Sequence, residues 1–332
     1  MVGELALALR AQGHEVVVYA TGDSALPGIE IRHYFVNSQW PPASSVEETH
    51  AAWCLRDIAR DPRGFDVVHL HCPAAVPLAR HLRCPVLYTL HHDVDPVLSA
   101  AYLEAPQTHL VAISRAQEAK ELAPICAVVH HGLDPSRFAP AADEGYLLFL
   151  GRYDRCKGPD LALDVAQRSG LPLVMAGAPH EPGFWENEIK PRLAIANAID
   201  MGPVGGRRKA SLIARARALI FPVRWDEPFG LVMIESMLSG VPVLGLSRGS
   251  VPEVIDDGIT GLCCNTVEEM SQAASLSDKI FDRVRVRAHA QRRWSSARMA
   301  DDYASLYASF ATDDSRTRRL TSAEPGEVAA NS

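Results

Sequence analysis

Short, continuous runs of Val, Ile and Leu recur along most of this chain, and segments with helical spacing separate them. A strand buried on both faces of a parallel sheet reads as such a run, whereas a half-exposed strand alternates apolar with polar residues. The alternation of runs and helical segments therefore predicts doubly wound α/β domains. The runs lie at 14–20, 65–70, 85–90, 108–113, 125–129, 146–151, 171–177, 218–223 and 241–246. Helices are expected at 5–12, 160–170, 208–218 and 230–240.

The chain divides most naturally near residues 138–145, a short segment rich in Ala, Pro and acidic residues that lacks periodicity. We expect an N-terminal Rossmann-like domain over 1–138 and a C-terminal one over 139–295. A helix is expected at 296–312, because its large apolar side chains recur near helical spacing. The polar segment 313–332 has few large apolar residues and is expected to be disordered.

Charge and cysteine usage exclude several classes of protein. Asp and Glu total 40 against 33 for Lys and Arg, so the net charge is -7, and such a field repels nucleic acid and anionic membranes. The 7 cysteines include no C-x-x-C pair and indicate reduced thiols. No apolar run approaches the roughly 18–20 residues that span a bilayer, and the N-terminus lacks the pattern of a signal peptide. We expect a cytoplasmic protein with no transmembrane segment and no nucleic-acid partner.

The segment 224–245 combines carboxylates with the start of a predicted helix. Glu227 lies in the loop before the helix, and Glu235 lies inside it. The first turn of a helix has N–H groups without intrahelical partners, and its dipole favours anions. Carboxylates beside it can accept hydrogen bonds from sugar or ribose hydroxyls. Two glutamates near a helix start are also common on ordinary surfaces, so both interpretations stay open from these residues alone.

A second segment, LFLGRYDRCKG at 148–158, places cations where a predicted strand ends. The strand ends at Gly151, and Arg152 and Lys157 follow it. Open α/β sheets bind ligands beyond the carboxyl ends of their strands. Two cations there could neutralise a diphosphate, Arg152 through a bidentate fork and Lys157 as a point charge. The alternative is a solvated basic turn.

Taken in order, these segments resemble a known family over nearly the whole chain. GRYDRCKG, EPFGLVMIE and GSVPEVIDDGITG are similar to the C-terminal half of the retaining glycosyltransferases of family 4. The N-terminal half contributes GHEVVVYA, DVVHLH, TLHHD, AISRAQ and HHGLDPSRF in the family's order. The resemblance implies the GT-B fold, two Rossmann-like domains facing each other across a cleft. It also implies a hexosyltransferase that moves a sugar from a nucleotide diphosphate sugar to an acceptor hydroxyl, with the anomeric configuration kept.

The resemblance implies roles for residues of the C-terminal half. Arg152 and Lys157 would bind the donor diphosphate and stabilise the charge that develops as it leaves. Glu227 would lie near the hydroxyls of the donor sugar, and Glu235 would accept hydrogen bonds from the ribose. No catalytic role is implied for Glu253, for which a structural role is at least as fitting. Further donor contacts would come from Gly151, Phe229, Gly230, Leu231 and, beside the base, Val204.

From the N-terminal half, the resemblance implies that His91 contacts the donor sugar across the cleft, or His92 if the register differs by one. It implies no bound metal and no cofactor, because the two cations do the work of a metal. A UDP-sugar is the most frequent donor in the family, ahead of GDP- and ADP-sugars. The acceptor would be a small molecule or a glycan, and these residues do not specify it.

Two other functions are suggested by the N-terminus, which departs from the family's pattern, and by the histidines that follow predicted strands. Family members begin with a strand and a glycine-rich loop, whereas this chain begins inside a predicted helix. A start codon assigned too late is the favoured explanation; a true truncation would suggest a catalytically inactive nucleotide-binding protein. A metal-dependent hydrolase is the lesser alternative, because several histidines follow predicted strands and could assemble a metal site. These are His69, His71, His91, His92, His130 and His131.

Overall fold

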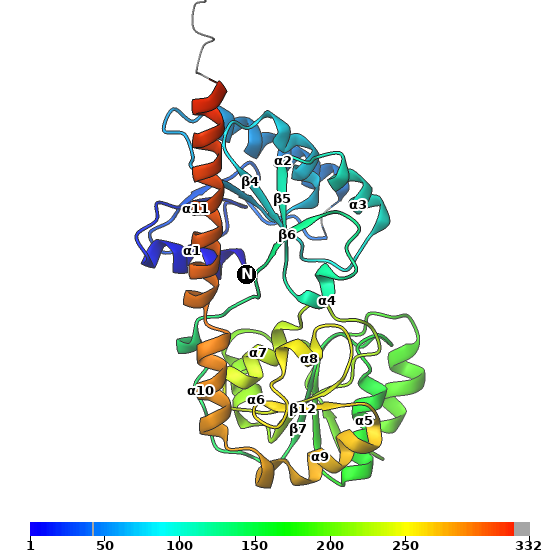
Figure 1. Cartoon of the computed structure of the whole chain (residues 1–332). Coiled ribbons are helices and arrows are strands. Elements are labelled where there is room, and N and C mark those ends of the chain that lie inside the picture. The colour runs from blue at the N-terminus through cyan, green and yellow to red at the C-terminus, as the bar shows by residue number, and fades with distance from the viewer. Residues whose placement is uncertain (42, 322–332) are drawn as a thin grey trace, which may run out of the picture.

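The computed structural model describes the backbone of residues 1–41 and 43–321, with side chains as far as Phe310. Two α/β bodies are stacked on one another (Figure 1). The N-terminal body, blue to cyan, lies above the C-terminal body, which runs from green through yellow to the orange of α10. Each body has its own parallel sheet, as the continuous apolar runs predict.

The sheet of the C-terminal body has six parallel strands in the order β12-β11-β10-β7-β8-β9. The chain starts at β7, builds outward to β9, then returns to the other side of β7 with β10. The point where the order reverses therefore lies between β7 and β10, which is where open α/β sheets place ligands. The strands are β7 (Leu147–Leu150), β8 (Leu173–Ala176), β9 (Ala198–Asp200), β10 (Ala218–Phe221), β11 (Val243–Leu246) and β12 (Gly261–Cys264).

Helices cover this sheet and bury its central strands completely. Leu147, Leu219 and Val243 have no exposed surface, which explains why their runs show no polar alternation. The helices are α5 (Pro159–Ser169), α6 (Gly206–Arg215), α7 (Leu231–Leu238), α8 (Val251–Val254), α9 (Val267–Ile280) and α10 (Arg283–Arg293). A π-helical turn at Trp185–Ile189 and a 3₁₀ turn at Lys190–Arg192 precede β9.

The N-terminal body contains a four-stranded parallel sheet, β3-β4-β5-β6, and a separate parallel pair, β1-β2. The strands are β1 (Val17–Tyr19), β2 (Glu30–Arg32), β3 (Val68–Leu70), β4 (Val86–Thr89), β5 (Thr108–Ala112) and β6 (Ile125–Val128). The helices are α1 (Val2–Ala11), α2 (Ser44–Arg60), α3 (Pro96–Leu103) and α4 (Arg115–Glu118). Two 3₁₀ segments lie at Pro73–His81 and Pro135–Arg137.

The strands β2, β9 and β12 lie outside the predicted runs, and each sits at the edge of its sheet. The strands β2 and β9 have three residues each. Their side chains are exposed or half-buried, so neither strand needs a continuous apolar stretch. An edge strand of this length carries no periodicity signal that a sequence reading can use.

The chain crosses between the bodies twice, and the two crossings are bonded to each other. The Leu133 amide donates to the Trp294 carbonyl (2.9 Å), and the Ser296 amide donates to the Leu133 carbonyl (2.9 Å). A Cβ on Gly132 would lie 2.2 Å from the Ser295 carbonyl oxygen, so the close approach of the crossings requires glycine there. The bodies therefore share a paired double connection.

The last helix, α11 (Ser296–Thr321), returns along the N-terminal body and packs beside α1. Met299 and Tyr303 are buried in a cluster with Leu5 of α1 and Leu87 of β4. The predicted end at residue 312 is wrong: the helix continues to Thr321, so residues 313–321 of the predicted disordered tail are helical. Extending an already formed helix costs far less than starting one. Residues 322–332 lie outside the described residues.

Within the described part of the chain, none of the helices combines the length and the apolar character needed to cross a bilayer.

Candidate active site

A cavity of about 140 Å³ lies where the order of the C-terminal sheet reverses, at the carboxyl ends of β7 and β10. Ligand pockets usually measure roughly 300–1,000 Å³, so a bound nucleotide sugar would extend beyond this cavity along the edge of the sheet. The lining includes five residues of the predicted site, and these are Gly151, Lys157, Glu227, Gly230 and Leu231.

Lys157 and Glu227 form an ion pair on the wall of this cavity. The Lys157 ammonium lies 2.5 Å from Glu227 Oε2, and Trp225 Nε1 donates to the same oxygen at 2.9 Å. The ammonium also lies 4.7 Å from the centre of the Trp225 ring. The two charged side chains are only 19 % and 11 % exposed. Both groups are thus held in place before any ligand arrives, which is what stabilising a developing charge requires.

The start of α7 brings backbone N–H groups to the same cavity. Gly230 is the N-cap of α7 and has φ +78, in the left-handed region that favours glycine. The next two residues, Leu231 and Val232, line the cavity. The first N–H groups of a helix have no intrahelical acceptor, and the helix dipole adds positive potential there. The cavity therefore offers one ammonium and a helix N-terminus to an anion.

Glu235 lies further along α7, and Lys209 of α6 holds it. The Lys209 ammonium is 2.7 Å from the Glu235 carboxylate. Val204 lies just before α6, and the cavity lining includes neither Val204 nor Lys209 and Glu235. Sequence analysis missed Lys209, because a contact between two helices leaves no local pattern.

Arg152 and Phe229 take positions that differ from that of Lys157. The Arg152 side chain is 52 % exposed and binds Asp154, with Nε 3.0 Å from Oδ2. It does not line the cavity. Phe229 is buried, and its ring meets the edge of the His131 ring with centroids 5.0 Å apart. The structure therefore gathers Lys157 and Glu227 into one cavity and turns Arg152 toward a neighbouring carboxylate.

His91 reaches the C-terminal body through a column of histidine rings. His91 Nε2 lies 2.9 Å from His71 Nδ1, and its ring stacks on His131 with centroids 5.3 Å apart. Since His131 also contacts Phe229, the column links the end of β4 to the loop before α7. His92 instead binds the Tyr102 hydroxyl through Nε2 (2.8 Å), within the N-terminal body. Of the two predicted histidines, His91 is the one directed to the facing body.

Desolvation disfavours the charged form of the rings in this column. It lowers the pKa of His91 to about 4, and the positive N-terminal amine lowers it further. Burial likewise lowers the pKa of His131 well below its usual value, with His91 adding to the effect. Neutral rings can stack and form hydrogen bonds with each other without charge repulsion, so these contacts are compatible with neutral pH.

The histidines do not form the metal site that a hydrolase would need. Among residues 1–41 and 43–310, no group of three or more His, Cys, Asp or Glu side chains is placed to hold a metal ion. Both ring nitrogens of His69 form hydrogen bonds, Nδ1 with the Tyr307 hydroxyl and Nε2 with the Thr89 hydroxyl, each at 2.7 Å. The predicted metal-dependent hydrolase therefore lacks its centre in the described structure.

Comparison with curated proteins finds D-inositol 3-phosphate glycosyltransferases among the relatives. The D-inositol 3-phosphate glycosyltransferase of Mycobacteroides abscessus is 29 % identical over 83 % of this chain, which spans 64 % of that protein. The enzyme of the same name from Mycolicibacterium smegmatis is 25 % identical over 84 % of this chain and 77 % of its own length.

Solved structures share the fold. AviGT4, a glycosyltransferase involved in avilamycin A biosynthesis, superposes with a TM-score of 0.72 at 24 % identity, covering 94 % of this chain and 89 % of its own. Anabaena HepE in complex with UDP and glucose gives 0.73 at 16 % identity, over 92 % and 96 %. Among sequence families, residues 1–155 match "Glycosyltransferase Family 4", and residues 134–295 match "Glycosyl transferases group 1". Because the two matches together span residues 1–295, this chain belongs to the family 4, group 1 glycosyltransferases and has their GT-B fold.

Proposed function

We propose that this protein transfers a sugar from a nucleotide diphosphate sugar, a UDP-sugar first, to an acceptor hydroxyl with retention of configuration. The observation that carries the proposal is the Lys157–Glu227 pair, held in a cavity at the reversal point of the sheet and facing the start of α7. We further propose that residues 139–295 bind the donor and residues 1–138 the acceptor, each from its side of the interface between the bodies.

In this proposal, Lys157 and the first turn of α7 hold the donor diphosphate. Their positive charge stabilises the diphosphate as its bond to the sugar breaks and the sugar becomes oxocarbenium-like. Arg152 would leave Asp154 and add a second cation when the diphosphate binds. Glu227 orients Lys157 and lies where hydroxyls of the sugar would reach its carboxylate. Glu235, fixed by Lys209, would accept hydrogen bonds from the ribose.

The departing diphosphate would take the proton of the acceptor hydroxyl on the face it leaves. The new bond then forms on that same face, which keeps the configuration and needs no protein nucleophile. His91 would contact the donor sugar from the N-terminal body. Since the protein supplies cationic charge itself, we propose that transfer requires neither a metal ion nor a cofactor.

The relatives suggest which substrates to try first. HepE was solved with UDP and glucose, and the curated relatives are named for D-inositol 3-phosphate. UDP-glucose is therefore the first donor to try, and D-inositol 3-phosphate is the first acceptor. Sugars and other polyols complete the acceptor panel.

The test is transfer by the purified protein, with UDP release and the product followed by NMR. We expect an α-configured product from an α-configured donor, at the same rate with and without EDTA. A β-configured product would contradict retention. Loss of activity in EDTA with recovery on adding Mg²⁺ would contradict metal independence. Saturable nucleotide binding without transfer to any acceptor would favour the inactive nucleotide-binding protein.

A further inference from the structure

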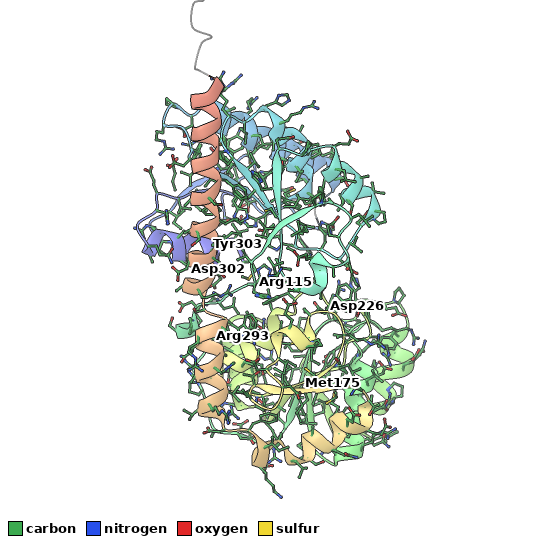
Figure 2. All side chains as sticks on the ribbon, viewed as in Figure 1. Arg115, Met175, Asp226, Arg293, Asp302 and Tyr303 are labelled. Carbon is green, nitrogen blue, oxygen red and sulfur yellow. The ribbon has the colours of Figure 1, made fainter. Side chains whose placement is uncertain are left out.

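Glu253 of α8 reaches across the interface between the bodies. Its carboxylate accepts hydrogen bonds from the backbone amides of Arg115 (2.8 and 2.9 Å) and Ala116 (3.3 Å), which begin α4 of the N-terminal body. It also lies 2.5 Å from His130 Nε2, in the first crossing segment. Figure 2 shows Arg115 beside the interface, with Asp226 on the facing body. One carboxylate thus bonds to both the opposite body and the connection between them.

The same short turn is bonded to the loop that carries the candidate site. The Ser250 amide donates to the Glu227 carbonyl at 2.9 Å, and its hydroxyl donates to the Phe229 carbonyl at 3.0 Å. A Cβ on Gly249 would lie 2.5 Å from the Glu227 amide nitrogen, so the two segments are in close backbone contact. A shift of Glu253 relative to α4 therefore changes the position of the loop at 227–229.

Further bonds fix the other end of α8. Arg293 donates through Nη2 to the Glu253 carbonyl at 2.9 Å, and through Nη1 to Asp256 at 2.8 Å. The Glu253 side chain is only 17 % exposed. Burial raises its pKa, but the hydrogen bonds from His130 and the α4 amides lower it by more, so the carboxylate is ionised at neutral pH. A mostly buried carboxylate that accepts hydrogen bonds from backbone amides is a strong contact.

A second contact between the bodies is weaker. The Lys120 ammonium lies 2.7 Å from Asp226 Oδ2, but the side chains are 35 % and 44 % exposed. Exposed ion pairs of this kind contribute about 0–1 kcal/mol. Compared with this exposed pair, Glu253 makes the more protected polar contact between the bodies.

We propose that Glu253 is a positioning residue that latches the N-terminal body to the donor loop in the arrangement that performs transfer. That this arrangement performs transfer rests on the proposed function, whereas the contacts between Glu253 and α4 do not depend on it. The bonds exist only when the bodies are closed on each other, so they favour that state over an open one. Alignment across the interface then brings the acceptor and the donor into reacting geometry.

The first test replaces the carboxylate, Glu253→Gln, and measures kcat together with hydrogen exchange of the amides at 114–118. We expect kcat to fall about 10- to 100-fold, the scale of a small misplacement of reacting groups. The dissociation constant for UDP should stay within about twofold, because the proposed function assigns UDP binding to the C-terminal body. The Arg115 and Ala116 amides should exchange faster, because nothing within α4 accepts their protons. Glu118→Gln is the control, since the ion pair that Glu118 makes with the described residues is the one with Arg115 inside α4.

The second test removes one donated N–H and leaves Glu253 intact. Arg115 is the first residue of α4, where proline is well tolerated, and Ser114 already has the extended conformation that precedes proline (φ -158, ψ 159). Arg115→Pro should lower kcat several-fold with UDP affinity unchanged, whereas Arg115→Ala, which keeps the N–H, should not. Wild-type kcat and wild-type exchange in both Glu253→Gln and Arg115→Pro would overturn the latch. If the wild type transfers no sugar, the proposed function fails, but the exchange rates still decide whether the latch exists.

Discussion

Replacing Lys157 with alanine should lower kcat about 10²–10³-fold, the cost of removing one preorganised contact to a developing charge. The effect should be large because the ammonium is held by Glu227 and the Trp225 ring before substrate binds. Release of UDP from the donor under saturating conditions measures it directly. Lys157→Arg should recover part of the rate, since it restores the positive charge but replaces the compact ammonium with a planar guanidinium.

The control for this prediction is a lysine of similar type in a surface pair. Lys190 lies 2.9 Å from Glu186, with both side chains more than half exposed. Lys190→Ala should leave kcat within about twofold, because exposed pairs contribute little. Lys157→Ala also leaves Glu227 without its cation in a nearly buried place, so the melting temperature must be measured beside kcat. A folded Lys157→Ala protein with a near-normal rate would contradict the role given to this lysine.

Replacing Glu227 with glutamine should lower kcat/KM about 10²-fold. The amide keeps the size of the side chain but loses the charge that fixes Lys157 and one of the oxygens that can accept from sugar hydroxyls. Since Lys157 and Glu227 act as a unit, their effects should not add. The double variant should be only slightly slower than Lys157→Ala alone.

A double-mutant cycle measures this coupling. The cycle needs kcat/KM for the wild type, both single variants and the double variant, with one donor and one acceptor. Additive losses in the cycle would mean that Glu227 acts on the sugar without acting through Lys157. Equal rates in wild type and Glu227→Gln would remove this carboxylate from the site.

The central strands and the Lys157–Glu227 pair could be predicted because each is marked by a local sequence pattern. Strands buried on both faces read as apolar runs, and the segments of Lys157 and Glu227 each follow such a run. Carboxyl ends of neighbouring parallel strands meet at one edge, so residues far apart in sequence meet there as well. The structure places both residues on one cavity wall. The GT-B fold predicted from the ordered motifs is confirmed.

The remaining features depend on contacts that no local pattern records. Lys209 meets Glu235 across two helices, and Glu253 meets Arg115 across two bodies. Arg152 pairs with its near neighbour Asp154 and does not line the cavity. Three points stay predictions: the division of the chain into a donor and an acceptor domain, the individual roles of the site residues, and the cytoplasmic location.

The most direct test of the central claim is a thermal-shift titration of this chain with UDP, GDP and ADP. We expect a saturable shift with UDP, because a ligand at about a hundred times its dissociation constant adds roughly 2.7 kcal/mol to the free energy of unfolding. The shift should be smaller at each UDP concentration in Lys157→Ala and unchanged in Lys190→Ala. Cooperative melting with no shift for any nucleotide, or an equal UDP shift in Lys157→Ala, would contradict a donor site built around Lys157 and Glu227.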